Sequence, residues 1–137
     1  MKQFTRYSDW GLLALRIALG SIFIAHGLLK WGLWSAAPSE QLSAGMLWIL
    51  RILSIAEPLG GAAIIVGFWT PAAAIGMAVV MLGVINMKIN SMHTGFIGQK
   101  GTGWELDFLV LCSALCILFV GTGKYTITKL FSKTQAE

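Results

Sequence analysis

Ionisable and amide side chains interrupt the long apolar stretches of this sequence. A charge at the centre of a membrane-spanning helix costs about 2.5–3.5 kcal/mol, so such residues persist where they pair with one another or line a functional site. The candidates for ligand binding or proton exchange are Arg16, His26, Lys30, Glu57, Asn86, His93 and Glu105.

These side chains suit proton exchange and the binding of carbonyl oxygens. Imidazole and carboxyl groups can move protons near neutral pH or bind the carbonyl oxygens of a quinone. Two histidines on different helices, His26 and His93, could also ligate a haem or a metal. The sequence has no haem-attachment motif and no dense cluster of His, Cys, Asp and Glu. We therefore predict no metal site and name no catalytic residue.

Spacing predicts that the polar groups gather at one end of a bundle. His26 and Lys30 are four residues apart and share a helix face. Asn86, Asn90 and His93 also share one, at intervals of four and three residues. We expect these groups and Glu105 at one end, with Glu57 as the floor of a pocket and Arg16 in the opposite half.

Each candidate also has a structural interpretation. Lys30, Arg51 and Lys88 stand near helix ends, where long side chains can extend to the membrane surface. Arg16 and Glu57 could form an ion pair that fixes the register of two helices. The sequence alone leaves both interpretations open beside the functional one.

The elements that position these residues are apolar helices. Hydrophobic residues make up 56% of the 137 residues and charged residues 12%, about half the roughly 25% of a soluble domain. The sequence predicts an all-α, integral membrane four-helix bundle in a single domain, 1–137. Its transmembrane helices are expected at about 10–34, 45–67, 71–90 and 104–122, each near the ~20 residues that cross a bilayer.

Tryptophans and turn residues support these boundaries. All six tryptophans fall near a predicted helix end, where indole prefers the interface between lipid and water. Gly67, Thr70 and Pro71 predict a tight connection between two antiparallel helices. Four helices place the N and C termini on the same side of the membrane.

Charge indicates orientation and a class of partner. Of the ten Lys and Arg residues, five stand in the two tails: Lys2, Arg6, Lys124, Lys129 and Lys133. This pattern fits the positive-inside rule better than nucleic-acid binding, so we expect cytoplasmic tails and no nucleic-acid partner. Lipid is the expected surroundings, in a bacterial-type plasma (inner) membrane that the chain crosses several times.

Four segments in order resemble the DoxX family of small four-helix membrane proteins. They cover nearly the whole chain: Arg16-Ile-Ala-Leu-Gly20 with His26-Gly27 and Lys30; Glu57-Pro-Leu-Gly60-Gly61 with Gly67-Phe-Trp-Thr70-Pro71; His93-Thr-Gly95-Phe96 with Gly103-Trp104-Glu105; and Gly121-Thr-Gly123-Lys124. The resemblance implies a link to quinone-dependent electron transfer, because the family is named for a thiosulfate:quinone oxidoreductase subunit. It also implies that the candidates other than Asn86 occupy motif positions.

Three functions follow as hypotheses. The first is a quinone-linked redox protein, or a subunit of a membrane oxidoreductase, with a redox partner protein. In it, His26 with Lys30 or His93 binds a quinone carbonyl, and Glu57 or Glu105 exchanges protons. The second is a non-enzymatic accessory or assembly subunit. The third is a small transporter or metal-handling protein, for which a homo-oligomer would supply the missing wall.

Overall fold

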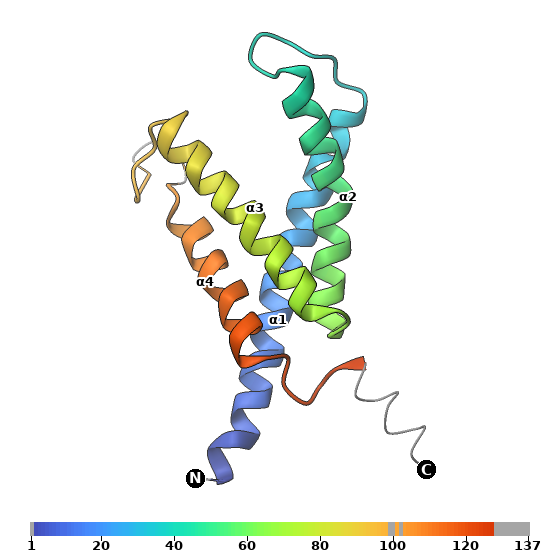
Figure 1. Cartoon of the computed structure of the whole chain (residues 1–137), viewed down its shortest axis with the longest axis vertical. Helices are drawn as coiled ribbons and strands as arrows, with labels where there is room; N and C mark the ends of the chain where they lie inside the picture. The colour runs from blue at the N-terminus through green and yellow to red at the C-terminus, as the bar shows by residue number, and fades with distance from the viewer. Residues whose placement is uncertain (1, 99–100, 102, 128–137) are drawn as a thin grey trace.

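The computed structural model describes residues 2–98, 101 and 103–127, apart from the side chains of residues 2–6. Its described part is all-α (Figure 1). The elements in order are α1 (Lys2–Leu29), the 3-10 helix η1 (Lys30–Trp34), α2 (Ala44–Val66), α3 (Thr70–Asn90) and α4 (Glu105–Val120). The predicted fold class is confirmed.

Three helices are long and apolar enough to cross a membrane: Tyr7–Trp34, Ala44–Val66 and Thr70–Asn90. α4 has 16 residues and spans about 24 Å at 1.5 Å per residue, less than the sequence predicted. It ends early because Gly121 takes a φ of 91°, which the helix cannot continue through. The protein is a membrane protein, and α4 is the shortest of the four α-helices in its described part.

The first helix also differs from its predicted range. It begins at Lys2 instead of about residue 10, and its α-helical geometry ends at Leu29, followed by the five-residue η1. The 3-10 geometry brings two indole N–H groups against α2. Trp31 Nε1 donates to the Ser54 carbonyl and Trp34 Nε1 donates to Ser54 Oγ, each at 3.0 Å.

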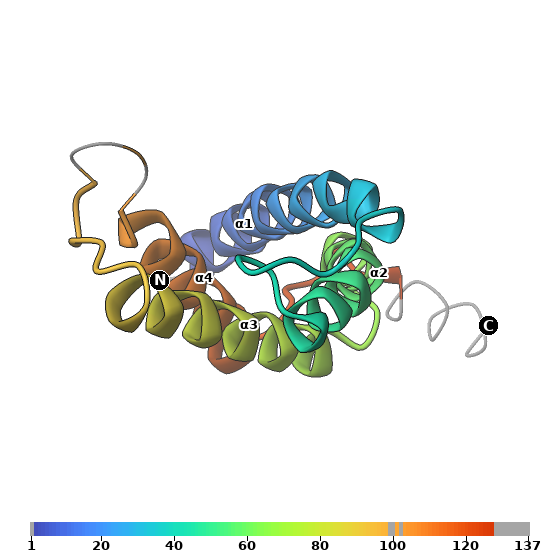
Figure 2. The same cartoon turned by 90° about the horizontal axis from the view of Figure 1, so that it is seen from above.

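The helices form two antiparallel hairpins. α1 packs mainly on α2, and α3 mainly on α4. Seen from above, α1 and α3 lie on opposite sides, with α2 and α4 between them (Figure 2). The tight turn between α2 and α3 begins at Gly67, a left-handed cap with a φ of 77°, as predicted. The start of α1 and the described segment after α4 lie at the same end of the bundle (Figure 1).

Small residues allow α1 and α2 to cross closely. A Cβ atom on Gly20 would lie 2.5 Å from the carbonyl oxygen of Gly61, and a Cβ on Gly61 would lie 2.5 Å from that of Gly20. About two turns further along α1, a Cβ on Gly27 would overlap the ring of Pro58. Lipid offers no hydrophobic drive between helices, so this close van der Waals contact contributes to holding the hairpin together.

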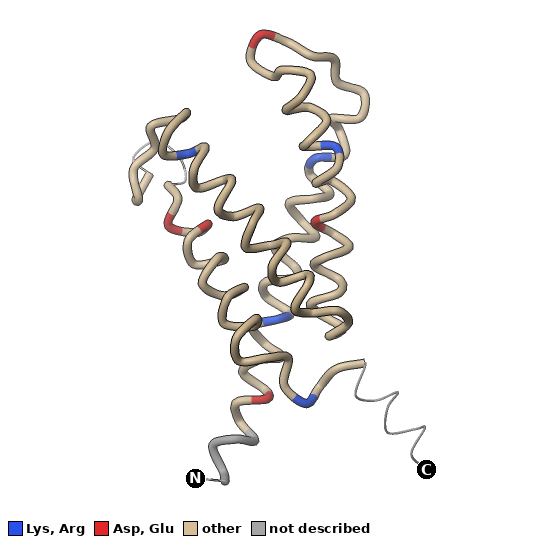
Figure 3. Tube along the Cα trace, in the orientation of Figure 1, with Lys and Arg blue, Asp and Glu red and all other residues tan. Residues whose placement is uncertain are grey.

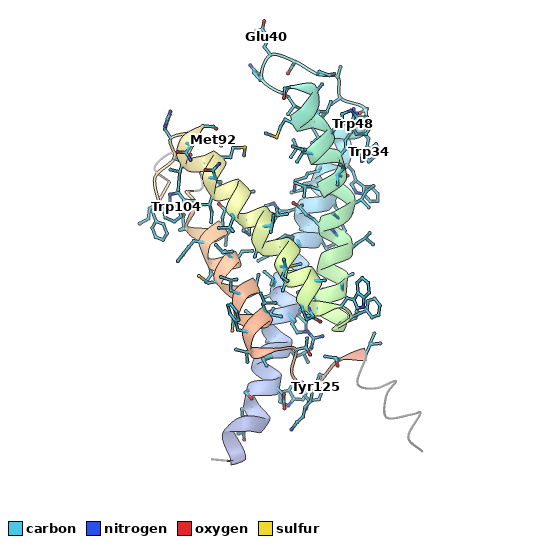
Figure 4. All side chains as sticks on the ribbon, viewed as in Figure 1. Trp34, Glu40, Trp48, Met92, Trp104 and Tyr125 are labelled. Atoms are coloured by element: carbon cyan, nitrogen blue, oxygen red, sulfur yellow. The ribbon has the colours of Figure 1, made fainter. Side chains whose placement is uncertain are left out.

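The buried core lies toward the end that holds the two termini. It combines residues from all four helices, including the last turn of α2 and the first two turns of α3: Leu19, Phe23, Ile64, Ala74, Met77, Val110, Ala114 and Ile117. From this core the two hairpins diverge toward the loop ends (Figure 1). Figure 4 shows Trp34 and Trp48 at one such loop end, Trp104 at the other, and Tyr125 at the opposite end of the molecule.

Candidate functional site

An ion pair joins α1 to the middle of α2. Lys30 Nζ lies 2.5 Å from Glu57 Oε2 and also donates to the carbonyl oxygen of His26 at 3.0 Å. The Glu57 side chain is 5% exposed and that of Lys30 20% exposed. Glu57 Oε1 accepts no hydrogen bond from any described residue. One of the two carboxylate oxygens of Glu57 therefore has a hydrogen-bond donor and the other has none among the described residues.

The backbone around the pair explains how Lys30 reaches Glu57. Gly27 lets α1 approach Pro58, the residue after Glu57, and Lys30 stands almost one turn beyond Gly27. Pro58 has no N–H, so it leaves the carbonyl of Ser54 without its helical donor. Trp31, beside Lys30, donates to that carbonyl and fixes the start of η1 against α2.

A cavity of about 150 Å³ adjoins Glu57 between α1, α2 and α3. Its lining residues are Phe23, Leu53, Ala56, Glu57, Gly60, Ala73, Gly76, Met77 and Val80. Glu57 is the charged residue in this otherwise apolar lining. Ala56 and Gly76 are exposed, so the cavity is reached from the outer surface between α2 and α3. Both α2 and α3 are long and apolar enough to cross a membrane.

Charged residues are few along the helices (Figure 3), and Arg16 is the most buried of them. Its guanidinium donates to the carbonyls of Ile64 and Ile65 at the end of α2, at 2.7 and 2.6 Å. It also donates to those of Thr122 and Tyr125 after α4, at 2.9 and 2.7 Å. The possible ion pair between Arg16 and Glu57 is therefore wrong. Arg16 instead satisfies carbonyls that a helix end leaves open.

Arg51 has a structural role at the loop end of the first hairpin. It donates to the carbonyls of Leu33 and Ala36 at 3.1 and 2.9 Å. Its guanidinium lies 5.9 Å from the ring centroid of Trp34 and 5.2 Å from that of Trp48, within cation–π range. It thus joins η1 to α2, which a lysine could not do with the same geometry.

His26, Asn86 and His93 do not converge on the cavity. All three are exposed, and none lines it. Asn90 Nδ2 donates to Asn86 Oδ1 at 2.7 Å, so the predicted shared face holds for these two residues. His93 lies beyond the end of α3 with a φ of 49°, which ends the helical spacing that placed it on that face.

The second hairpin has its own ion pair, which spacing did not predict. Lys88 Nζ lies 2.6 Å from Asp107 Oδ2 and donates to the carbonyl of Gly103 at 2.9 Å. Glu105 stands apart from this pair, and its Oε2 is buried without a hydrogen-bond partner among the residues that the structure describes. The sequence could have indicated this pair, because Lys88 stands near the end of α3 and Asp107 near the start of α4. These two ends meet in an antiparallel hairpin.

Of the predicted set, the structure thus brings together Lys30 and Glu57, with the backbone of His26. Arg16, Asn86, His93 and Glu105 lie elsewhere. Among the described residues, no group of three or more His, Cys, Asp and Glu side chains could hold a metal ion. The arrangement that can do chemistry is a buried carboxylate, paired with an amine, at the wall of an apolar cavity.

Comparison with known proteins identifies the family. The DoxX family model matches residues 11–93, more than half of the chain. This range contains Arg16, the Lys30–Glu57 pair, every lining residue of the cavity and all of α3. Neither the curated proteins nor the solved structures gave a match. The chain therefore belongs to the DoxX family.

Proposed function

We propose that this DoxX protein binds a quinone ring in the cavity beside Glu57 and acts in quinone-linked electron transfer, as a redox protein or a subunit of a membrane oxidoreductase. One observation carries the proposal: a buried, half-satisfied carboxylate lines an apolar cavity between helices that are long and apolar enough to cross a membrane. A quinone is dissolved in lipid and takes up or releases protons when its redox state changes. It needs this combination of an apolar entry and a proton-exchanging group.

The size of the cavity suits one ring. Its volume is about 150 Å³, and an engineered apolar cavity of roughly that size binds benzene. The isoprenoid tail of a quinone would remain in lipid, along the exposed surface next to Ala56 and Gly76. The small side chains at these two positions keep that entrance open.

The chemistry divides between this chain and a partner. Reduction of a quinone to a hydroquinone takes up two electrons and two protons. The electrons would come from a redox partner protein. The Lys30–Glu57 pair would exchange one of the two protons with the ring oxygen that faces it, and the second oxygen would exchange its proton with water or the partner protein. His26 and His93, which do not line the cavity, have no part in this form of the proposal.

The test is quinone binding to the purified protein in lipid nanodiscs. A short-chain benzoquinone or its hydroquinone should bind the wild-type protein, and binding of whichever redox form binds more tightly should weaken about tenfold or more in Lys30→Met and Glu57→Gln. Lys88→Met is the matched control, because it breaks an ion pair of the same kind that does not line the cavity. Binding that is absent in the wild type, or equally weakened in all three variants, would refute the proposal.

We also propose a bacterial-type plasma membrane with both tails in the cytoplasm. The support is the five of ten Lys and Arg residues in the tails, together with the described chain ends on one side of the bundle. A reporter fused to the C terminus distinguishes the two orientations, since alkaline phosphatase is active outside the cytoplasm and green fluorescent protein is fluorescent inside it.

A second candidate function is a non-enzymatic accessory subunit. The observation in its favour is that Arg16, Arg51 and Lys88 all donate hydrogen bonds within the chain. These bonds offset the free energy of placing charged side chains in a membrane, so no ligand is needed to explain them. Exposed His26 and Asn86 would then contact a partner helix, where polar side chains strengthen association. Copurification of a stoichiometric partner without bound quinone supports this function, and bound quinone without a partner argues against it.

A further inference from the structure

The hydrogen-bonding capacity that remains in the cavity is that of an acceptor. Glu57 Oε2 accepts from Lys30, whereas Glu57 Oε1 has no partner among the described residues. Lys30 directs two of its three N–H groups to Glu57 and the His26 carbonyl, and it does not line the cavity. The other lining side chains are apolar. A ligand in this cavity therefore meets a carboxylate oxygen that lacks a donor.

The two redox forms of a quinone differ in this respect. The oxidised form presents carbonyl oxygens, which accept hydrogen bonds and repel a carboxylate oxygen. The reduced form presents phenolic hydroxyls, which donate, and a hydroxyl bonded to a carboxylate makes one of the stronger hydrogen bonds in proteins. Burial strengthens the difference, because a 5% exposed carboxylate has little water to supply the missing donor.

We propose that the cavity binds the hydroquinone form in preference to the quinone, through an O–H donated to Glu57 Oε1. This inference rests on the proposed function, which places a quinone ring in the cavity. It reverses the expectation drawn from the sequence, in which a carbonyl oxygen was the group bound. The carboxylate recognises the hydroxyl hydrogen and is placed to accept it when the hydroquinone is oxidised.

Selective binding changes the redox properties of the ligand. A site that binds the reduced form tenfold more tightly raises the two-electron reduction potential of the bound pair by about 30 mV. The bound quinone is then a stronger electron acceptor than the quinone in lipid. The site favours the direction in which a partner protein reduces the quinone.

The test compares both redox forms of one short-chain benzoquinone. Protein in lipid nanodiscs is titrated without oxygen, and the dissociation constant is measured for each form. We expect the hydroquinone to bind about tenfold or more tightly than the quinone. Equal binding, or tighter binding of the quinone, overturns the inference and leaves the proposed function standing. Absence of binding by either form refutes the proposed function itself.

A second comparison needs no variant of the protein. The dimethyl ether of the hydroquinone keeps the ring and both oxygens but has no hydroxyl to donate. It should bind about tenfold or more weakly than the hydroquinone. Equal binding of the ether and the hydroquinone overturns the inference even if every variant at position 57 fails to fold.

A matched pair of variants then assigns the effect to one carboxylate. Glu57→Gln offers both a donor and an acceptor, so the two redox forms should bind within about threefold of each other. Asp107→Asn changes the carboxylate of the other ion pair, outside the cavity, and should retain the full preference. A preference that survives Glu57→Gln unchanged overturns the assignment to Glu57.

Discussion

The indole N–H of Trp31 bonds the carbonyl oxygen that Pro58 leaves without a donor. A proline inside a helix removes the hydrogen bond to the residue four positions earlier, which here is Ser54, and the loss contributes to a cost of about 3 kcal/mol or more. Trp31 Nε1 lies 3.0 Å from that carbonyl oxygen. Trp31 directly follows Lys30, so a side chain next to the Lys30–Glu57 pair completes the hydrogen bonding of α2.

Replacing Trp31 with phenylalanine should destabilise the fold by about 1 kcal/mol, because the Ser54 carbonyl then has no donor. Unfolding in mixed micelles measures the loss. Trp69→Phe is the control, since Trp69 is 74% exposed and its indole N–H makes no hydrogen bond to a described residue. In a Pro58→Ala background the backbone N–H returns, so Trp31→Phe should cost less there. An equal cost in both backgrounds contradicts this account.

Arg16→Met should destabilise the protein by about 3 kcal/mol or more, because four carbonyls lose a charged donor inside the bundle. Arg16→Lys should restore only part of the loss, since an ammonium cannot span the end of α2 and the segment after α4 as the guanidinium does. Lys124→Met is the control. Lys124 is 73% exposed and 3.4 Å from Asp9, so its removal should change stability by less than about 0.5 kcal/mol. Equal losses in Arg16→Met and Lys124→Met would disprove the role of Arg16.

Gly20→Ala should destabilise the α1–α2 hairpin by about 1–3 kcal/mol, because its Cβ would lie 2.5 Å from the Gly61 carbonyl oxygen. Gly11→Ala on the same helix has nothing within 4 Å of the added atom, so stability should stay equal or rise by up to about 1 kcal/mol. Thermal unfolding of the two variants in the same detergent compares them directly. Similar midpoints would mean that the close crossing does not hold the hairpin together.

Gly76→Leu should block ligand entry without loss of fold. Gly76 lines the cavity, yet a Cβ there meets nothing within 4 Å, so a larger side chain fills the entrance rather than displacing a neighbour. We expect quinone binding to weaken about tenfold while the unfolding midpoint stays unchanged. Gly83→Leu, on the same helix with equally open space but outside the cavity lining, should bind as the wild type does. Unaltered binding in Gly76→Leu would place the ligand elsewhere.

Ring size gives a prediction that needs only the wild-type protein. A cavity of about 150 Å³ has room for one six-membered ring, so a short-chain benzoquinone should bind more tightly than a naphthoquinone with the same chain. We expect a difference of about tenfold, measured as two dissociation constants in the same nanodiscs. Tighter binding of the bicyclic ring would show that the cavity widens beyond the volume described here.

The sequence predicts the helices better than the contacts of the polar residues. Apolar stretches and the Gly67 turn signal fix α2 and α3 within a residue or two, because burial in lipid and caps act locally. Such local signals could not predict that Lys30 is the ion-pair partner of Glu57. This pairing depends on Gly27 meeting Pro58, a contact between residues about thirty positions apart.

Two further misses have local causes. Helical spacing placed His93 beside Asn86 and Asn90, but α3 ends at Asn90 and His93 takes a left-handed conformation. For Arg16, a charge in an apolar stretch suggested a charged partner. The structure supplies backbone carbonyls instead. Every residue has a backbone carbonyl, so the residue types in a sequence cannot indicate which carbonyls will accept.

The bonds of Arg16 also bear on how the chain is made. Two of its four acceptors, Thr122 and Tyr125, follow it by 106 and 109 residues. During synthesis Arg16 therefore enters the membrane long before these acceptors exist, and its hydrogen bonds cannot all form until the segment after α4 has been made. A product that stops after α4 would carry a buried guanidinium with half its partners missing. The segment after α4 therefore decides when the arginine buried in α1 becomes fully hydrogen-bonded.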